Sequence, residues 1–411
     1  MYDVAVIGAG PTGSHVAFRL AAQGHEVVVV EKKAEIAAPV CCTGIISQEC
    51  FKSLDIADDV VFRNASGARL ISPSGKTLPL RRSEPQVAIV DRPAFNAALA
   101  RRAQEQGVEY HLGRAVVNLQ PGDKGVCLEL ETQGNGDESL PIQARVVVIA
   151  AGFASKLGGL GSGKTVDFVI GAQTEVETEG VDEVEVYFGE EVAPGFFAWL
   201  VPTLPGRALA GLMSRRNPDV YLKRFLAHLA AQGKITPAEG EVGLTYGGIP
   251  LQPLAKTYGD RTVLVGSAAG QVKPTTGGGI YYGLLCADIA AKHLNRALKI
   301  DSLSSRNLSR YQTEWRKRLG TELKIGYWAR KLSERLNDGQ IDQIFDIIGA
   351  SGIDKALLDA DDLSFDWHSK VVSRLLADRA LSRAMMVIKV PFITGRGREV
   401  QNNIRGYFAD E

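Results

Sequence analysis

Two short apolar runs lie near the N-terminus, with an amphipathic stretch between them. The first covers residues 2–7 and the second, rich in valine, covers residues 26–30. Uninterrupted apolar runs of this length are typical of strands buried on both faces of a sheet. Residues 14–24 are rich in alanine and leucine and favour a helix. The pattern therefore predicts a strand, a turn, a helix and a second strand.

The turn of this unit reads Gly8-Ala9-Gly10-Pro11-Thr12-Gly13. Gly8 allows the chain to reverse, Gly10 lacks the Cβ that would block a pyrophosphate, and Gly13 lets the helix approach the sheet. Glu31 follows Gly13 by eighteen residues, where its carboxylate can accept hydrogen bonds from ribose hydroxyls and would repel a 2′-phosphate. The spacing predicts a site for FAD or NAD rather than NADP. The alternative is a tight turn without a ligand.

Further along the chain the pattern alternates between strand and helix. We expect a helix after Pro93 with Asp91 or Arg92 at its cap, and a buried strand at residues 145–152. Other expected elements are a hairpin at 115–119 and 125–131, a second sheet from 166 to 212, a helix at 220–232, a strand and glycine turn at 262–270, and a helix ending near 298. From residue 308 the chain is expected to be mostly helical, with an apolar stripe of Trp315, Leu319, Leu323, Ile325 and Trp328.

These elements predict an α/β protein with a Rossmann-like FAD-binding domain, a second mixed or antiparallel sheet domain and a helical C-terminal region. The expected cofactor domain is discontinuous, with residues 1–165 and 255–300, of which 60–90 belong partly to the second sheet. The substrate-binding sheet takes residues 166–254. The helical region takes residues 301–411.

Composition excludes several classes of protein. Of the 411 residues, 45% are apolar and 23% charged, and the net charge is zero, which gives no basic excess for binding nucleic acid. The five cysteines form no Cys-x-x-Cys pair and the six histidines are scattered, so no metal site is expected. No apolar run is long enough to span a bilayer, and a strand is expected from residue 2 with no leader before it. A cytoplasmic protein is expected.

Three separated segments are predicted to meet at one edge of the first sheet: residues 8–13, Asp91-Arg92 and residues 266–280. A second glycine-rich helix start supplies N–H donors for the negative charge of a reduced flavin, and Gly277-Gly278-Gly279 lets the backbone lie against a flat ring. These features favour a flavin over a nicotinamide. The alternative is a flexible glycine loop.

Together these motifs resemble the flavoprotein hydroxylase superfamily and, within it, the geranylgeranyl reductase family. Pro39-Val40-Cys41-Cys42-Thr43-Gly44 is similar to the family's Pro-Val-x-Cys stretch beside the flavin, and residues 197–202 with Gly211 are similar to its tunnel motif. The resemblance implies FAD contacts at Gly8, Gly10, Thr12, Gly13, Glu31, Lys32, Cys42, Thr43, Gly44, Arg92, Val116, Ser267, Gly278, Gly279 and Ile280. It implies substrate contacts at Phe197, Trp199, Pro202 and Gly211.

The chain departs from the family pattern at four positions. Ser267 stands where the family has the aspartate that binds the ribityl chain, and a hydroxyl brings a hydrogen bond without charge. Phe197 replaces a tyrosine, Val201 a phenylalanine and Met213 the second glycine of Gly-x-Gly. The substrate is therefore not fixed by the resemblance.

Cys42 and the aromatic strand each have two interpretations. Cys42 is either an apolar filler beside the flavin or a catalytic group that donates a proton or tunes the flavin. Phe197 and Trp199 are either core residues of the second sheet or the wall of a prenyl channel.

The resemblance implies an FAD-dependent reductase that saturates carbon–carbon double bonds of a geranylgeranyl chain on a lipid or a diphosphate, by hydride transfer from flavin N5. An external donor such as NAD(P)H or ferredoxin would reduce the flavin, since no second nucleotide motif is evident. The alternatives are a flavin monooxygenase or halogenase, and a flavin protein that only carries electrons. Residues 384–393 are apolar with flanking basic residues, which suggests either peripheral membrane contact or a buried helix.

Overall fold

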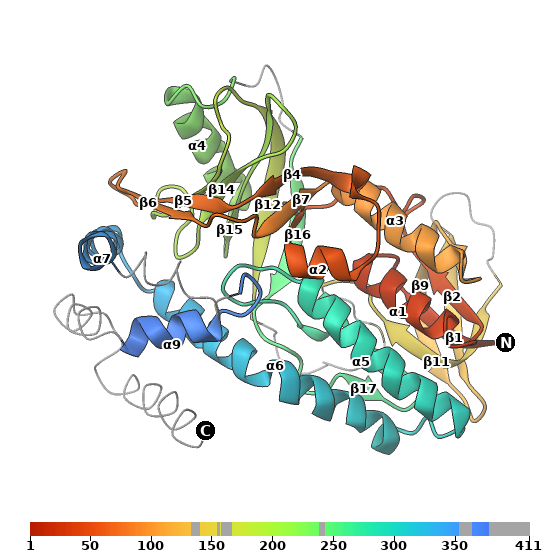
Figure 1. The fold of residues 1–411 in the computed structure, drawn as a ribbon. Coiled ribbons are helices and arrows are strands. Elements are labelled where there is room, and N and C mark those ends of the chain that lie inside the picture. The colour runs from red at the N-terminus through yellow and green to blue at the C-terminus, as the bar shows by residue number, and fades with distance from the viewer. Residues whose placement is uncertain (133–139, 154–156, 158–166, 238–242, 353–363, 378–411) are drawn as a thin grey trace.

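The computed structural model describes residues 1–132, 140–153, 157, 167–237, 243–352 and 364–377. Within them the chain forms an eight-stranded sheet, a seven-stranded sheet and a three-stranded sheet, with most helices packed around the first (Figure 1). This is the α/β architecture that the sequence predicts. The apolar segment at 384–393 lies outside the described residues. No helix in the described ranges combines the length and the apolar character needed to cross a bilayer.

The eight-stranded sheet carries the first glycine turn. Its main order is β17-β18-β11-β1-β2-β8, and β9 and β10 extend it from β11. Strands β1, β2, β11 and β18 are parallel, so their carboxyl ends meet at one edge, as Ile7, Val30, Ile149 and Leu264 show by their register. The bounds are β1 Tyr2–Ile7, β2 Val27–Val30, β8 Glu109–His111, β9 Arg114–Pro121, β10 Val126–Thr132, β11 Ile142–Ile149, β17 Tyr258–Gly259 and β18 Thr262–Leu264.

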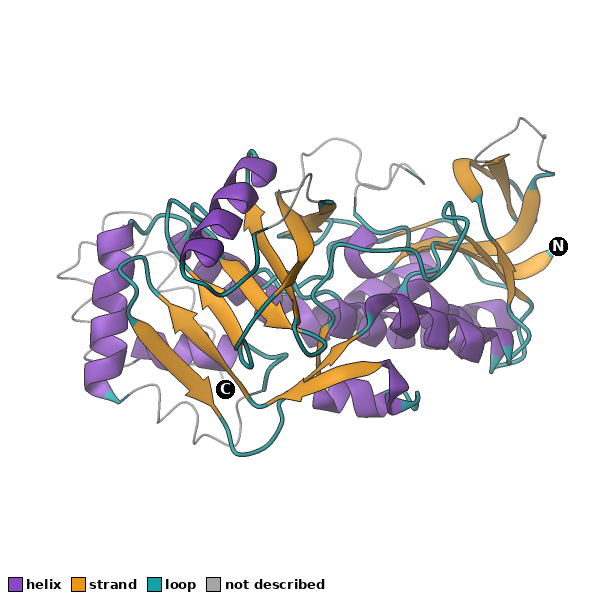
Figure 2. Cartoon of the chain, turned by 90° about the horizontal axis from the view of Figure 1, so that it is seen from above, coloured by secondary structure: helices purple, strands orange, loops and turns teal. Residues whose placement is uncertain are grey.

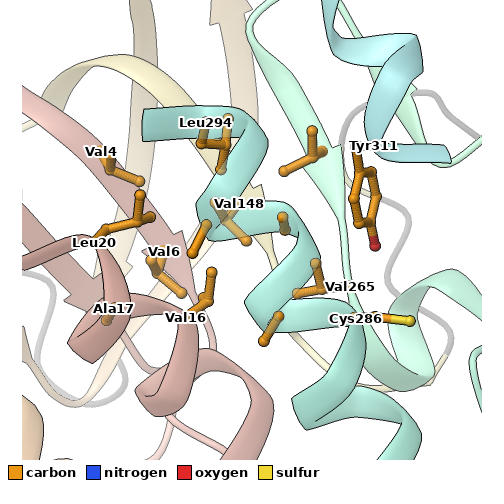
Figure 3. Close-up of a cluster of buried hydrophobic side chains, with 14 of the residues drawn as sticks. Val4, Val6, Val16, Ala17, Leu20, Val148, Val265, Cys286, Leu294 and Tyr311 are labelled. Atoms are coloured by element: carbon orange, nitrogen blue, oxygen red, sulfur yellow. The ribbon is translucent and has the colours of Figure 1, made fainter. Parts of the chain in front are cut away.

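Alternation along β1 divides the core of this sheet between its two faces. Val4 and Val6 pack under helices α1 (Pro11–Ala21) and α5 (Ile280–Lys299), whereas Ala5 and Ile7 face the opposite side. Figure 3 shows Val4, Val6 and Val148 of the strands meeting Leu20 of α1 and Leu294 of α5. The two helices lie side by side over the sheet (Figure 1), and their N-termini stand at the edge where the parallel strands end.

The second sheet has the order β16-β12-β15-β14-β13-β5-β6 and pairs mostly antiparallel. Its strands β5 and β6 come from residues 67–81, which pair with β13 and with each other. Helix α4 (Pro218–Ala231) covers one face with buried Leu222, Phe225 and Leu229. The strands are β5 Gly67–Ile71, β6 Thr77–Arg81, β12 Phe168–Glu177, β13 Val184–Tyr187, β14 Ala198–Pro202, β15 Arg207–Ser214 and β16 Thr245–Pro250.

A small third sheet leads into two helices. Its order is β3-β7-β4, with β3 Ile45–Ser47, β4 Val61–Ala65 and β7 Val87–Val90. Helix α2 (Gln48–Ser53) follows β3, and helix α3 (Arg92–Gln104) follows β7. Asp91 caps α3 by accepting a hydrogen bond from the Ala94 backbone N–H, as the sequence predicts.

The long helix α6 (Ser305–Ser333) contacts both large sheets. Near its start, the Tyr311 hydroxyl donates to the Leu264 carbonyl at 2.8 Å, and near its end the Tyr327 hydroxyl donates to Asp167, just before β12, at 2.9 Å. Trp328 is 40% exposed, so the predicted apolar stripe ends before it. The helix must turn that residue outward because Tyr327 faces the second sheet.

Two shorter helices complete the described chain, α7 (Asp338–Ser351) and α9 (Ser369–Ala377). Helix α7 lies beside β6 at the far end of the second sheet, as Figure 2 shows. Lys76 in the β5–β6 turn pairs with Asp346 of α7 at 2.7 Å. Helix α9 packs against α6.

Candidate functional site

A cavity of about 1140 Å³ extends from the first glycine turn to the second sheet. One end is lined by backbone of the turns that follow β1, β11 and β18. The other end is lined by apolar side chains of β5, β13 and β14 and by Ala329, Arg330 and Ser333 of α6. Its size and its few convergent polar groups are those of a cofactor and substrate site.

The first glycine turn is built by contacts that only glycine allows. Gly8 has a φ of +105°, and a Cβ added at Gly13 would lie 1.9 Å from the Gly8 carbonyl oxygen. At Gly10 an added Cβ would meet no described atom within 4 Å, because that side of the residue opens into the cavity. Gly8 and Gly13 therefore shape the turn, and Gly10 leaves room for a ligand.

Glu31 stands beside this turn at the end of β2. Its two carboxylate oxygens accept backbone N–H groups of Ala9, at 2.8 Å, and of Lys33, at 3.0 Å. These bonds fix the carboxylate at the cavity wall and leave lone pairs for ligand hydroxyls. Lys32 and Thr12 also line this end.

Arg92 and Asn96 project from α3 into the cavity. They are 8% and 4% exposed, and Arg92 Nε, Arg92 Nη1 and Asn96 Oδ1 have no hydrogen-bond partner in the described chain. Buried polar groups without partners cost free energy, so they point to a polar ligand in the cavity. The sequence identifies Arg92 but misses Asn96. Asn96 lies one helical turn after Arg92, and this spacing could have indicated that both side chains share one face of the helix.

The turn after β18 completes the cofactor end. Gly266 and Gly283 both face Thr12, whose Oγ1 would lie 2.8 and 2.3 Å from a Cβ added at each of them. This close packing brings η2 (Gly266–Ala269) and the start of α5 against the first glycine turn. Ser267, Gly278, Gly279 and Ile280, all predicted cofactor contacts, line the cavity there.

A buried ion pair lies next to the second glycine loop. The ammonium of Lys273 contacts Asp366 Oδ1 at 2.8 Å, and both residues line the cavity. The sequence gives no role to either residue, because Asp366 comes from a segment about ninety residues later. Burial and the neighbouring Lys273 charge lower the pKa of His368 to about 4, so this ring stays neutral near pH 7.

The two adjacent cysteines differ in their surroundings. Burial raises the pKa of Cys41 to about 11, and its side chain packs against Gly247, where an added Cβ would lie 3.3 Å from the Cys41 Cβ. Cys42 lines the cavity, and its carbonyl accepts a hydrogen bond from Gln173 Nε2 at 3.4 Å. Thr43 lines the cavity beside it. Both cysteines line the cavity, and the Cys41 side chain also packs against Gly247.

The strands of the second sheet give the far end of the cavity a mostly apolar wall. Phe197 and Trp199 meet edge to face with their centroids 6.1 Å apart, and the Trp199 indole N–H donates to Gln173 Oε1 at 3.3 Å. Gln173 therefore links the Cys42 loop to the aromatic wall, a role that no sequence motif marks. The other apolar lining side chains include Leu70, Val184, Val186, Phe188, Val201 and Met213.

Gly211 supports this wall from behind. A Cβ added there would lie 2.6 Å from two atoms of the Trp199 indole and 2.7 Å from the Ala172 carbonyl oxygen. The glycine lets the indole lie flat on β15.

We expect Gly211→Ala to destabilise the fold by about 1–3 kcal/mol, because the methyl group overpacks the indole. Urea unfolding followed by tryptophan fluorescence measures the effect. Gly171→Ala on the neighbouring strand is the matched control, since its Cβ meets other atoms only at 3.4 Å or beyond. Equal stability of the two variants would contradict this role for Gly211.

Five of the sequence-predicted site residues do not line the cavity. Gly13 and Gly44 act through the backbone, since a Cβ at Gly44 would lie 2.3 Å from the Val90 carbonyl oxygen. Gly211 acts through Trp199, and Pro202 ends β14 opposite Ala208. The Val116 side chain packs on the core of the first sheet, so its position gives no support to a side-chain contact with the cofactor.

The donor set fits FAD. Gly10 leaves space at the helix start, Glu31 presents a fixed carboxylate for a ribose, and Arg92 and Asn96 present buried groups that lack partners. The second glycine loop offers a backbone surface against which a flat ring can lie.

Comparisons with known proteins agree with this geometry. The family model described as lycopene cyclase protein matches residues 3–346. Digeranylgeranylglycerophospholipid reductase of Methanocaldococcus jannaschii is 32% identical over 86% of this chain and 93% of its own length. Digeranylgeranylglycerophospholipid reductase 2 of Methanopyrus kandleri is 31% identical over 86% of this chain and 91% of its own.

Solved structures show the same fold. A geranylgeranyl bacteriochlorophyll reductase-like protein from Thermoplasma acidophilum superposes with a TM-score of 0.81 at 22% identity, over 94% of this chain and 98% of that one. Halogenase PltM in complex with phloroglucinol and FAD gives a TM-score of 0.61 at 14% identity, over 94% and 96%. The chain belongs to the geranylgeranyl reductase family of FAD-dependent oxidoreductases.

Proposed function

We propose that this protein binds FAD and reduces carbon–carbon double bonds of geranylgeranyl chains carried on a glycerophospholipid. The observation that carries the proposal is the continuity of the cavity, in which the glycine turns and the apolar wall of the second sheet line one space. A cofactor bound at the turns would therefore adjoin an apolar chain. The relatives whose names specify digeranylgeranylglycerophospholipid favour the phospholipid over a free diphosphate.

Different residues of this chain would bind different parts of FAD. Gly10 and the start of α1 would hold the pyrophosphate, and Glu31 would hold the adenosine ribose. Arg92, Ser267 and the loop at Gly278 and Gly279 would hold the flavin part. Bound and reduced, FAD supplies a hydride from N5 to one alkene carbon.

The apolar end would orient the prenyl chain and exclude water. An isolated alkene is a weak electrophile, so a proton must reach the second carbon as the hydride reaches the first. Cys42 Sγ is a candidate donor, because Cys42 lines the cavity on the loop that joins its two ends. Phe197, Trp199 and Val201 would keep the alkene in place through apolar contact.

The reductant that reloads the flavin would be an external donor, either NAD(P)H or ferredoxin. The sequence carries a single nucleotide fingerprint, at residues 8–13, and the flavin would occupy it. Reduction of each double bond consumes two electrons and two protons in all. The donor must therefore return two electrons to the flavin for each bond reduced.

Product analysis tests the proposal. Dithionite-reduced protein is incubated without oxygen with digeranylgeranylglycerophospholipid, geranylgeranyl diphosphate or geranylgeraniol, and the products are weighed by mass spectrometry. We expect the phospholipid to gain the mass of two hydrogen atoms per reduced bond, faster than the other two. Faster reduction of the diphosphate would overturn the choice of head group. No gain with any acceptor, with FAD bound and reducible, would favour an electron carrier.

A further inference from the structure

The Lys273–Asp366 pair leaves one carboxylate oxygen unsatisfied inside the cavity. Lys273 is 4% exposed and Asp366 is 1% exposed. Asp366 Oδ1 takes the hydrogen bond from the ammonium, whereas Oδ2 is buried and has no partner among the described residues. A buried carboxylate oxygen without a donor is costly. Because the residue lines the cavity, a ligand there can supply the missing donor.

The pair lies beside the second glycine loop. The Lys273 backbone N–H donates to the Gly278 carbonyl at 2.9 Å, and a Cβ at Gly278 would lie 2.7 Å from Lys273 Cε and 3.3 Å from Nζ. Glu31 marks the other end of the cofactor site, beside the first turn. The pair therefore faces the part of the cavity assigned to the flavin ring rather than the part assigned to the adenosine.

The two side chains present a donor next to an acceptor. Lys273 Nζ has three N–H groups, of which one serves Asp366 and one serves the Phe365 carbonyl at 3.3 Å. One N–H remains for a ligand carbonyl, beside the free Asp366 Oδ2. An isoalloxazine carries the complementary pattern on its pyrimidine edge, where the N3–H lies between two carbonyls.

We propose that Lys273 and Asp366 bind the pyrimidine edge of the flavin, with Asp366 Oδ2 accepting its N3–H and Lys273 Nζ donating to an adjacent carbonyl. The inference rests on the proposed FAD site and adds two contacts to it. It supplies a carboxylate at the flavin where Ser267 provides none. Because the ammonium and the carboxylate have opposite charges, the pair adds no net charge beside the ring, and its effect is on binding through two hydrogen bonds.

Hydrogen bonds other than those of the ion pair hold the segment that carries Asp366. The Tyr282 hydroxyl donates to the Asp366 carbonyl at 2.9 Å, the His368 N–H donates to Glu322, and Thr275 Oγ1 lies 2.6 Å from His368 Nδ1. Residue 366 should therefore stay in place when its side chain is changed, and its variants are suitable probes.

Two variants and one analogue test the inference. Asp366→Asn keeps the shape of the side chain, and Lys273→Met with Asp366→Ala removes both charges and leaves space. The affinities of each apoprotein for FAD and for 3-methyl-FAD, which lacks the N3–H, are measured by quenching of flavin fluorescence. We expect the wild type to prefer FAD by ~10-fold or more, as for a hydrogen bond to a charged acceptor. The preference should nearly vanish in the double variant.

The control is a matched ion pair away from the cavity. Lys292 and Glu314 lie 2.8 Å apart on the surface, and Lys292→Met with Glu314→Ala should change neither the affinity for FAD nor its preference over 3-methyl-FAD. An equal preference for FAD in wild type and double variant would overturn the inference. If the double variant also melted earlier, the pair would stabilise the glycine loop without contacting the flavin. A wild type that binds neither flavin would overturn the FAD site itself.

Discussion

Gly10→Ala is expected to abolish measurable FAD binding while leaving the fold intact. The added methyl group meets no described protein atom within 4 Å, so the substitution adds no clash to the folded chain. The methyl group instead enters the cavity at the start of α1, where the pyrophosphate would approach the backbone N–H groups. We expect the FAD affinity to fall by ~100-fold or more, since two charge-assisted hydrogen bonds are each worth about 1.5–3 kcal/mol.

Gly320→Ala is the matched control for this result. Gly320 lies in α6, does not line the cavity and also has open space around an added Cβ among the described atoms. Alanine favours a helix over glycine by about 1 kcal/mol, so this variant should bind FAD normally and melt no earlier than the wild type. Equal FAD affinity of the Gly10→Ala and Gly320→Ala variants, measured by titration of apoprotein, would refute the placement of the pyrophosphate.

Val186→Asp is expected to lower prenyl reduction by ~100-fold or more without loss of FAD. Val186 lies on β13 between Leu70 of β5 and Trp199 of β14, and all three line the apolar end of the cavity. A carboxylate there must either lose its hydration when a prenyl chain enters or keep water that excludes the chain. An unpaired buried charge costs about 3–5 kcal/mol. A 100-fold lower rate corresponds to about 2.7 kcal/mol, so this cost is large enough to produce the expected loss.

Val186→Asn separates charge from shape, because asparagine matches aspartate in size and lacks its charge. We expect this variant to lose far less activity than Val186→Asp. Rates of double-bond reduction and bound FAD per chain are measured on the same samples. Wild-type turnover by Val186→Asp would show that the prenyl chain does not bind against β13.

The turn, strand end and helix cap that form the predicted cofactor end follow from local signals in the sequence. The residues 8–13 turn, Glu31 and the Asp91 cap each depend on neighbours within about thirty positions, and the structure places all of them as expected. The same holds for the strand that carries Phe197 and Trp199. Periodicity and turn chemistry act over such distances.

Residues that depend on contacts between distant segments could not be predicted. Asp366 reaches Lys273 across about ninety residues, and Gln173 of β12 reaches both the Cys42 loop and Trp199, which lies two strands away in the same sheet. Helical spacing alone places Asn96 on the same face as Arg92. An asparagine on a predicted helix is not a site residue by type, however, and only the cavity identifies it as one. The error at Trp328 has a similar cause, since α6 contacts two sheets in succession and its buried face changes along its length.

The central claim is that one cavity holds a reduced flavin against a prenyl chain. Stopped-flow absorbance tests it most directly, by mixing reduced protein with digeranylgeranylglycerophospholipid in the absence of oxygen. We predict that one flavin is reoxidised for each double bond saturated, at a rate that Val186→Asp lowers by ~100-fold or more. A flavin that stays reduced with the lipid, and reoxidises only when oxygen is admitted, would contradict the account.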